Sequence, residues 1–133
     1  MAVIVIVDDD PTVRLIAAEL LRQENHVIVE ARDGDEALRV IGSLAVDLVV
    51  LDILMPNKDG LETIVELRRT QPDVRILAIS SGGRVGAGPL LRTAMVLGAD
   101  DTLVKPLRLE TFARSVSRLL SVPTTGAVSR QAG

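Results

Sequence analysis

Five short runs of aliphatic residues alternate with longer stretches of helical periodicity, and this alternation limits the fold more than any other feature of the sequence. The runs are Ala2 to Val7, Val27 to Glu30, Asp47 to Leu51, Val74 to Ile79 and Asp101 to Val104. Continuous apolar runs rich in valine and isoleucine are typical of strands that are covered on both faces. Strands that alternate with helices through right-handed crossovers form a parallel sheet. The sequence therefore predicts an α/β fold, a doubly wound five-stranded parallel sheet with five helices.

Capping residues and apolar stripes mark the five helices. Asp10 before Pro11 predicts an N-cap and a first helical position, and this helix is expected to reach about Glu24. Asp33, with a glutamate three residues later, is close to a capping box and opens a second helix that we expect to stop at Gly42. The other helices are expected over about Leu61 to Thr70, around Leu90, Leu91, Ala94 and Leu97, and around Phe112, Val116, Leu119 and Leu120.

The composition excludes several classes of protein. Fifteen Lys and Arg against eighteen Asp and Glu, with no basic run, give no bulk attraction to nucleic acid or to an anionic membrane. There is no cysteine for a disulfide or a thiolate metal site. The first apolar run lacks a basic start, and no run approaches the ~20 apolar residues of a membrane span. We therefore expect a cytoplasmic protein.

The chain is expected to hold one folded domain and a tail. A single aromatic residue, Phe112, leaves the core to aliphatic side chains. From about Ser121 the residues are small and polar and cannot bury much surface. We expect a domain over residues 1–120 and a disordered C-terminal tail over residues 121–133.

Acidic, hydroxyl and basic side chains stand where four of the predicted strands end. Asp8 to Asp10 follow the first strand, Asp52 the third, Ser80 and Ser81 the fourth, and Lys105 the fifth. Ligands of doubly wound sheets bind outside the carboxyl ends of the strands. These side chains are therefore expected to lie at one edge of the sheet.

Carboxylates that gather at one edge repel one another unless a cation lies between them. Oxygen ligands with no histidine or cysteine nearby favour magnesium, or manganese, over zinc. Magnesium usually keeps positions for water and for phosphate oxygens, which Lys105 and the Ser80 hydroxyl are placed to hold from the other side. Asp52 is then the candidate nucleophile, because aspartate can form an acyl phosphate.

Simpler structural roles stay open for some of these residues. Asp10 is more typical of a helix cap than of a ligand, and Asp8 and Asp9 could merely complement the helix dipole. The Ser80 hydroxyl could satisfy loop backbone.

Two other features are not assigned to the site. The glycine-rich segment from Ser80 to Pro89 lacks both a P-loop GK[ST] and a GxGxxG after a first strand, so we interpret it as a mobile connection and not a phosphate cradle. His26, the only histidine, is expected at the surface, far from this edge.

Five short motifs, in their order and spacing, resemble the receiver domain of two-component response regulators, in particular chemotaxis-type, stand-alone receivers. They are VDDDP (Val7 to Pro11), VVLDILMP with a later DG (Val49 to Pro56, Asp59 and Gly60), AISS (Ala78 to Ser81), GADD (Gly98 to Asp101) and VKP (Val104 to Pro106). The resemblance covers about Ala2 to Leu120. It implies the flavodoxin-like strand order 2-1-3-4-5.

The resemblance implies a phosphoacceptor and a metal site. Asp52 would accept the phosphoryl group. Asp8 and Asp9 would form the acidic pair, with Asp9 the nearer Mg²⁺ ligand, and the backbone carbonyl of Leu54 would complete the metal site together with Asp52.

The resemblance also implies the groups that hold the phosphoryl oxygens. Ser80, with Ser81 beside it, would supply the switch hydroxyl, and Lys105 would bond the phosphoryl group. The peptide between Lys105 and Pro106 is expected to be cis. Thr102 departs from the family pattern, which usually has an aromatic switch residue at this position.

The implied function is a phosphorylation-dependent switch and not a turnover enzyme. A histidine kinase or histidine phosphotransfer protein would phosphorylate Asp52 with Mg²⁺. The face from the fourth strand to the fifth helix would then alter binding to an unknown protein target. We expect no direct binding to nucleic acid or membrane, and a monomer or a weak phosphorylation-dependent homodimer.

Two other functions agree less well with the sequence. A dehalogenase-like phosphohydrolase also uses an aspartate nucleophile, but it needs a second aspartate two residues later as acid or base, where this chain has Leu54. A degenerate receiver would only bind partners, but the site positions all carry competent chemistry.

Overall fold

The computed structural model describes residues 1–55, 59–81 and 86–121, in which strands and helices alternate. The elements are β1 (Val3–Val7), α1 (Pro11–Arg22), β2 (Val27–Ala31), α2 (Gly34–Ser43), β3 (Leu48–Asp52), α3 (Gly60–Thr70), β4 (Arg75–Ser80), α4 (Ala87–Leu97), β5 (Asp101–Val104) and α5 (Leu109–Ser121). The predicted tail, from residue 122 onward, and the centre of the glycine-rich segment lie outside the described residues.

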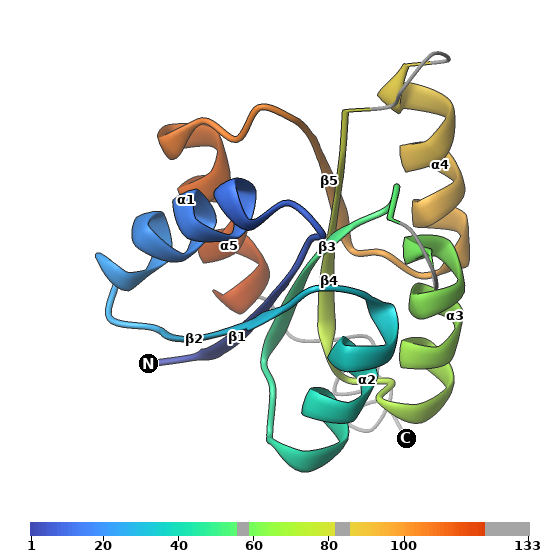
Figure 1. Cartoon of the computed structure of the whole chain (residues 1–133), viewed down its shortest axis with the longest axis horizontal. Helices are drawn as coiled ribbons and strands as arrows, with labels where there is room; N and C mark the ends of the chain where they lie inside the picture. The colour runs from blue at the N-terminus through green and yellow to red at the C-terminus, as the bar shows by residue number, and fades with distance from the viewer. Residues whose placement is uncertain (56–58, 82–85, 122–133) are drawn as a thin grey trace.

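The five strands form one parallel sheet in the order β2-β1-β3-β4-β5. Helices α1 and α5 cover one face, and α2, α3 and α4 cover the other (Figure 1). The predicted fold class and strand order are confirmed. Because β3 is the central strand, its last residue, Asp52, lies in the middle of the carboxyl edge.

The core consists of two aliphatic layers, one on each face of the sheet. Alternate residues of each strand point to opposite faces. In β3, Leu48 and Val50 pack on the α1 and α5 side, while Val49 and Leu51 pack on the α2, α3 and α4 side. Phe112 is fully buried in the α1 and α5 layer. The sheet is therefore buried on both of its faces.

Two of the predicted helix caps are confirmed. The Asp10 carboxylate accepts a hydrogen bond from the Thr12 N–H at 2.9 Å, so this aspartate caps α1. Asp33 accepts from the Glu36 N–H at 2.9 Å. The Glu36 carboxylate in turn accepts from the N–H of Arg32, at 3.2 Å, which closes a slightly displaced capping box.

Three predicted helix boundaries are wrong. Gly42 does not stop α2, which continues to Ser43, because the chain leaves this helix at Leu44 in an extended conformation that needs no glycine. Helix α1 ends at Arg22, two residues early. The last three residues of the glycine-rich segment belong to α4, which begins at Ala87, so that Pro89 lies in the first turn of the helix, where no N–H is required.

Within the part of the chain that is described, none of the helices has the length and apolar character that a membrane span requires.

Candidate functional site

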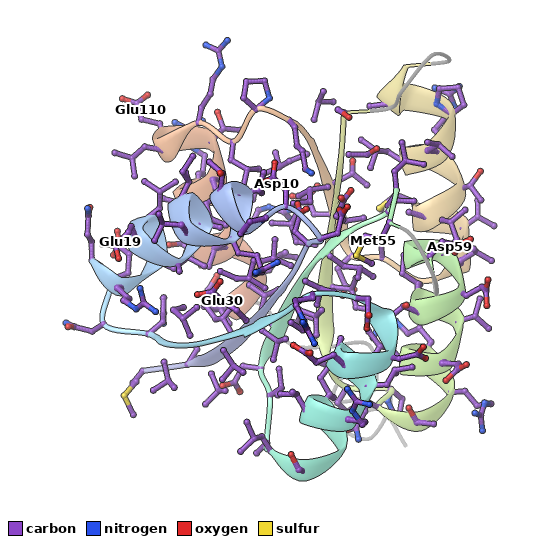
Figure 2. The ribbon with its side chains drawn as sticks, in the orientation of Figure 1. Asp10, Glu19, Glu30, Met55, Asp59 and Glu110 are labelled. Carbon is purple, nitrogen blue, oxygen red and sulfur yellow. The ribbon has the colours of Figure 1, made fainter. Side chains whose placement is uncertain are left out.

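The side chains predicted to form a site meet at the carboxyl edge of the sheet. Asp52 ends β3 and Ser80 ends β4, while Asp8 and Lys105 follow β1 and β5 directly. The ladder continues past the strands, because the Ile53 N–H donates to Ile79 O at 3.0 Å and the Lys105 N–H donates to Ser80 O at 3.0 Å. Figure 2 shows Asp10 at the start of α1, and Met55 and Asp59 on the segment between β3 and α3.

Three carboxylates form a compact acidic group at this edge. One oxygen from each of Asp8, Asp9 and Asp52 lies within 4.8 Å of the other two. Asp8 and Asp52 are 0% and 3% exposed, whereas Asp9 is exposed to solvent. One oxygen of each buried carboxylate is held by backbone, since Asp8 Oδ1 accepts from the Asp10 N–H at 2.9 Å and Asp52 Oδ1 accepts from the Leu54 N–H at 3.2 Å.

The ammonium group of Lys105 lies between the two buried carboxylates. Its Nζ is 2.8 Å from Asp8 Oδ2 and 3.2 Å from Asp52 Oδ2. Apart from this ion pair, Asp8 Oδ2 accepts no well-aligned hydrogen bond from the described residues, although it is fully buried. Among the described residues, one ammonium group therefore faces three carboxylates, and these four side chains together keep an excess of negative charge.

The charges shift the ionisation of two groups. Burial, and then the negative charge of Asp8, raise the pKa of Asp52 from its ordinary value of 3.8 to about 6, although Lys105 opposes this rise. Burial works to lower the pKa of Lys105, but the carboxylates of Asp8 and Asp52 more than offset it, so this pKa is raised. Lys105 is therefore charged at neutral pH, and Asp52 is mostly ionised.

The residues present fit a hard divalent cation such as Mg²⁺ or Mn²⁺. Each donor in the acidic group is an oxygen, and Mg²⁺ typically takes one or two carboxylates and completes its shell with water and phosphate oxygens. The buried Asp8 Oδ2 still has capacity to accept, and Asp9 opens the group to solvent. An added positive charge would also relieve the repulsion that raises the pKa of Asp52.

Gly60 lets α3 begin directly against the phosphoacceptor candidate. A Cβ atom at this position would lie 2.5 Å from the Asp52 carbonyl oxygen and 2.5 Å from Ile53 Cα. The Gly60 N–H donates to Ile53 O at 3.0 Å, and Asp59 caps α3 by accepting from the Glu62 N–H at 2.9 Å. The DG pair of the sequence motif is thus explained by a cap and a close backbone approach.

The other predicted site residues lie on β4 and β5 or directly after these strands. Ser80 is fully buried, while Ser81 is exposed and lines a pocket of about 310 Å³ with Lys105. Thr102 is half-buried on β5 and pairs with Ala78 of β4. The peptide between Lys105 and Pro106 is cis, as predicted.

His26 differs from the prediction in its burial. It lies just before β2, at the end of the sheet opposite the acidic group, as expected, but it is only partly exposed. The reason is local, because its Nδ1 accepts a hydrogen bond from the Ala2 N–H at 3.3 Å.

One residue at this edge was missed by the sequence analysis. Arg14, on α1, donates from its Nη1 to the Asp8 carbonyl oxygen at 2.7 Å, and its Nε lies 3.1 Å from Glu30 Oε1. The only sequence signal is that Arg14 stands one helical turn after the Asp10 cap and therefore near the acidic loop. Its pairing with Glu30, sixteen residues away, carries no local signal.

Comparison with known proteins gives one consistent family. The family described as "Response regulator receiver domain" matches residues 4–117. Response regulator MprA of Mycolicibacterium vanbaalenii is 39% identical over 127 residues, which cover 93% of this chain and 53% of that protein. The chain spans about half the length of the curated relatives it matches.

Two solved structures are similar over nearly the whole chain. Response regulator TrrA of Thermotoga maritima, in complex with Mg(2+)-BeF, is 33% identical with a TM-score of 0.80, over 90% of this chain and 100% of that one. NtrX of Brucella abortus, in complex with ADP, is 30% identical with a TM-score of 0.86, over 98% of this chain and 29% of that one.

Proposed function

This chain belongs to the response regulator receiver domain family, and from that premise we propose that it is a signalling switch in which Asp52 accepts the phosphoryl group. The observation that carries the proposal is the environment of Asp52. This buried carboxylate ends the central strand, with the Lys105 ammonium 3.2 Å away and two further carboxylates within 4.8 Å. Such an arrangement combines a nucleophile, a fixed cation and the oxygen ligands for a second cation.

The transfer step follows from this chemistry. A carboxylate oxygen of Asp52 forms a bond to the phosphorus of a phosphohistidine on a histidine kinase or a phosphotransfer protein. The phosphorus–nitrogen bond breaks, and the imidazole leaves and takes up a proton. The product is an acyl phosphate on Asp52, which water later hydrolyses to release inorganic phosphate and regenerate the carboxylate.

The other residues of the site bind and orient. Asp8, Asp9, Asp52 and the backbone carbonyl of Leu54 would hold the divalent cation. When bound, Mg²⁺ or Mn²⁺ supplies positive charge against the phosphoryl oxygens. Lys105 would turn from the Asp52 carboxylate to the new phosphoryl oxygens, and the Ser80 hydroxyl would donate to one of them, with Ser81 beside it. Catalysis would then consist of positioning and electrostatic stabilisation.

The signal would leave the site through Ser80 and α4. Thr102 is too small to fill the space of an aromatic ring, and its β-branch makes χ1 stiff, so a large rotamer change cannot carry the signal. The two ends of α4 are held differently. At its C-terminal end, Arg68 Nε donates to Gly98 O at 2.7 Å, whereas Gly86 caps its N-terminal end without a side-chain hydrogen bond. We therefore expect the N-terminal end to move, and the β4 to α5 face to change its affinity for a protein target.

The competing functions have less support. Leu54, an aliphatic side chain that is 44% exposed, stands where a phosphohydrolase would need a second aspartate. A partner-binding module without phosphorylation would not require a buried carboxylate with a raised pKa beside a half-buried lysine. The phosphorylated state is proposed to be a monomer or a weak homodimer.

The proposal is tested by incubating the protein with Mg²⁺ and acetyl phosphate and measuring its intact mass. We expect one labile adduct of phosphoryl mass on the wild type and none on Asp52→Asn. Asp100→Asn is a matched control, because Asp100 is an exposed aspartate that pairs with Arg68 away from the site. A wild type without an adduct, or an Asp52→Asn variant that is modified at the normal rate, would reject the assignment.

A further inference from the structure

Arg14 makes the contacts of a positioning residue at the proposed cation site. Its side chain is only 14% exposed, although it is charged and lies on a surface helix. One branch of the guanidinium reaches the Asp8 carbonyl oxygen at 2.7 Å, and the Nε side pairs with Glu30 at 3.1 Å. Glu30 points from β2 toward α1 (Figure 2). The contact therefore joins α1, β2 and the loop that carries the acidic pair.

The carbonyl that Arg14 holds belongs to the peptide between Asp8 and Asp9. A peptide is planar, so fixing its oxygen fixes the direction in which the chain continues to Asp9. The N–H of Asp8 is already held by Ala31 O at 3.1 Å, and Asp8 Oδ1 is held by the Asp10 N–H. Asp9 itself is exposed, and no side-chain hydrogen bond within the described residues orients its carboxylate. Its direction thus depends on the backbone that precedes it.

The charge of Arg14 does not act on the acidic group alone. Glu30 pairs with the guanidinium, so most of its positive charge is balanced outside the cation site. Arg14 therefore acts on the cation site mainly through the position of its guanidinium and not through its charge. A planar guanidinium can reach Glu30 and the Asp8 carbonyl together from two fixed N–H directions, whereas a lysine is a single flexible point charge.

We propose that Arg14 is a positioning residue for the divalent cation. It holds the peptide between Asp8 and Asp9 in the orientation from which Asp9 reaches the ion, and Glu30 fixes the guanidinium in turn. This inference rests on the proposed function, because it requires that the acidic group binds Mg²⁺. It assigns a role to a residue that touches neither the phosphoryl group nor the cation.

The test measures Mg²⁺ affinity directly, by calorimetric titration of the unphosphorylated full chain, for Arg14→Gln, Arg14→Lys and Glu30→Gln. Arg22→Gln is the matched control, since Arg22 lies on the same helix and pairs with Glu19 at 3.0 Å on the exposed face. Outer groups that orient metal ligands typically account for about 10-fold or more in affinity. We expect Arg14→Gln and Arg14→Lys to weaken Mg²⁺ binding about 10-fold, Glu30→Gln to weaken it less, and Arg22→Gln to leave it unchanged.

A second readout separates positioning from folding. In each variant the initial rate of phosphorylation by acetyl phosphate is measured against Mg²⁺ concentration, below the melting temperature found in EDTA. Positioning predicts that the half-saturating Mg²⁺ concentration rises as the dissociation constant does, while the rate at saturating Mg²⁺ is retained.

Two results would overturn the inference while the proposed function stands. One is an Arg14→Gln variant that loses thermal stability but binds Mg²⁺ like the wild type. The other is an Arg14→Lys variant with wild-type affinity, since that would show that the charge is sufficient. If Arg14→Gln does not fold, the milder Glu30→Gln variant provides the test. An unchanged Mg²⁺ affinity of Glu30→Gln would then reject the proposed positioning role of Arg14. A wild type that binds no Mg²⁺ would instead reject the proposed cation site itself.

Discussion

Replacing Asp52 by asparagine should stabilise the protein in the absence of divalent cations. Asparagine has nearly the shape of aspartic acid but no charge, so the change removes the burial of a carboxylate, its repulsion by Asp8 and its attraction to Lys105 together. The pKa of Asp52 reports the balance of these effects, and it is raised from 3.8 to about 6. At about 1.4 kcal/mol per pKa unit, the ionised form destabilises the fold by about 3 kcal/mol.

The same shift fixes the pH dependence. A carboxyl group whose pKa is raised by folding binds more protons in the folded state, so stability falls as pH rises between 3.8 and about 6. Near the lower end of this window, wild type and Asp52→Asn should be almost equally stable. Above its upper end the variant should be more stable by up to about 3 kcal/mol. In a domain of this size that difference corresponds to a rise in Tm of up to about 10 °C.

The assay is urea unfolding followed by circular dichroism, in EDTA, across this pH range. Only the difference between the two proteins is used, because the other carboxylates titrate in both. Adding Mg²⁺ should narrow the difference, since the wild type gains binding energy that the variant lacks in part. A difference that does not change with pH, or a variant that is less stable than the wild type at neutral pH in EDTA, would refute the electrostatic reasoning.

Three further predictions follow from individual contacts. Asp9→Ala should weaken Mg²⁺ binding more than Asp10→Ala does, as measured by thermal shifts against Mg²⁺ concentration. Asp10→Ala should instead cost about 1 kcal/mol of stability in EDTA, because the cap of α1 is lost. Equal losses of Mg²⁺ affinity in the two variants would reject the assignment of Asp9 as a ligand and Asp10 as a cap. Gly60→Ala should destabilise the fold by about 1–3 kcal/mol in urea unfolding, because a Cβ would overlap the backbone beneath it, and a neutral result would contradict that overlap. With a phosphoryl mimic, amide hydrogen exchange should change most at Ser81 and in α4, and a change confined to β5 or α5 would restore Thr102 as the switch.

The sequence predicted what depends on local periodicity and on topology. Strand alternation and the strand-end rule brought Asp8, Asp52 and Lys105 together, although Lys105 is far from both along the chain, and the structure confirms their contact. The Asp10 cap was predicted because proline and a preceding aspartate form a short-range signal. These features need no knowledge of side-chain packing.

The sequence could not predict what depends on packing between distant segments. The pairing of Arg14 with Glu30 joins a helix to a neighbouring strand, and each residue alone is typical of an exposed surface. Gly42 was predicted as a helix stop because glycine is common after helices. Helix α2 instead ends at Ser43, and Leu44 follows in an extended conformation that needs no glycine. Which chain conformation follows a helix is decided by the next element and not by the glycine.

The most direct test of the central claim locates the phosphoryl group itself. The protein is phosphorylated with acetyl phosphate and Mg²⁺, reduced with borohydride, which converts an aspartyl phosphate to homoserine, digested, and sequenced by tandem mass spectrometry. The account predicts conversion at Asp52 alone, dependent on both Mg²⁺ and acetyl phosphate. Conversion at Asp8 or Asp9 with Asp52 unmodified, or no conversion of a wild type that binds Mg²⁺, would contradict it.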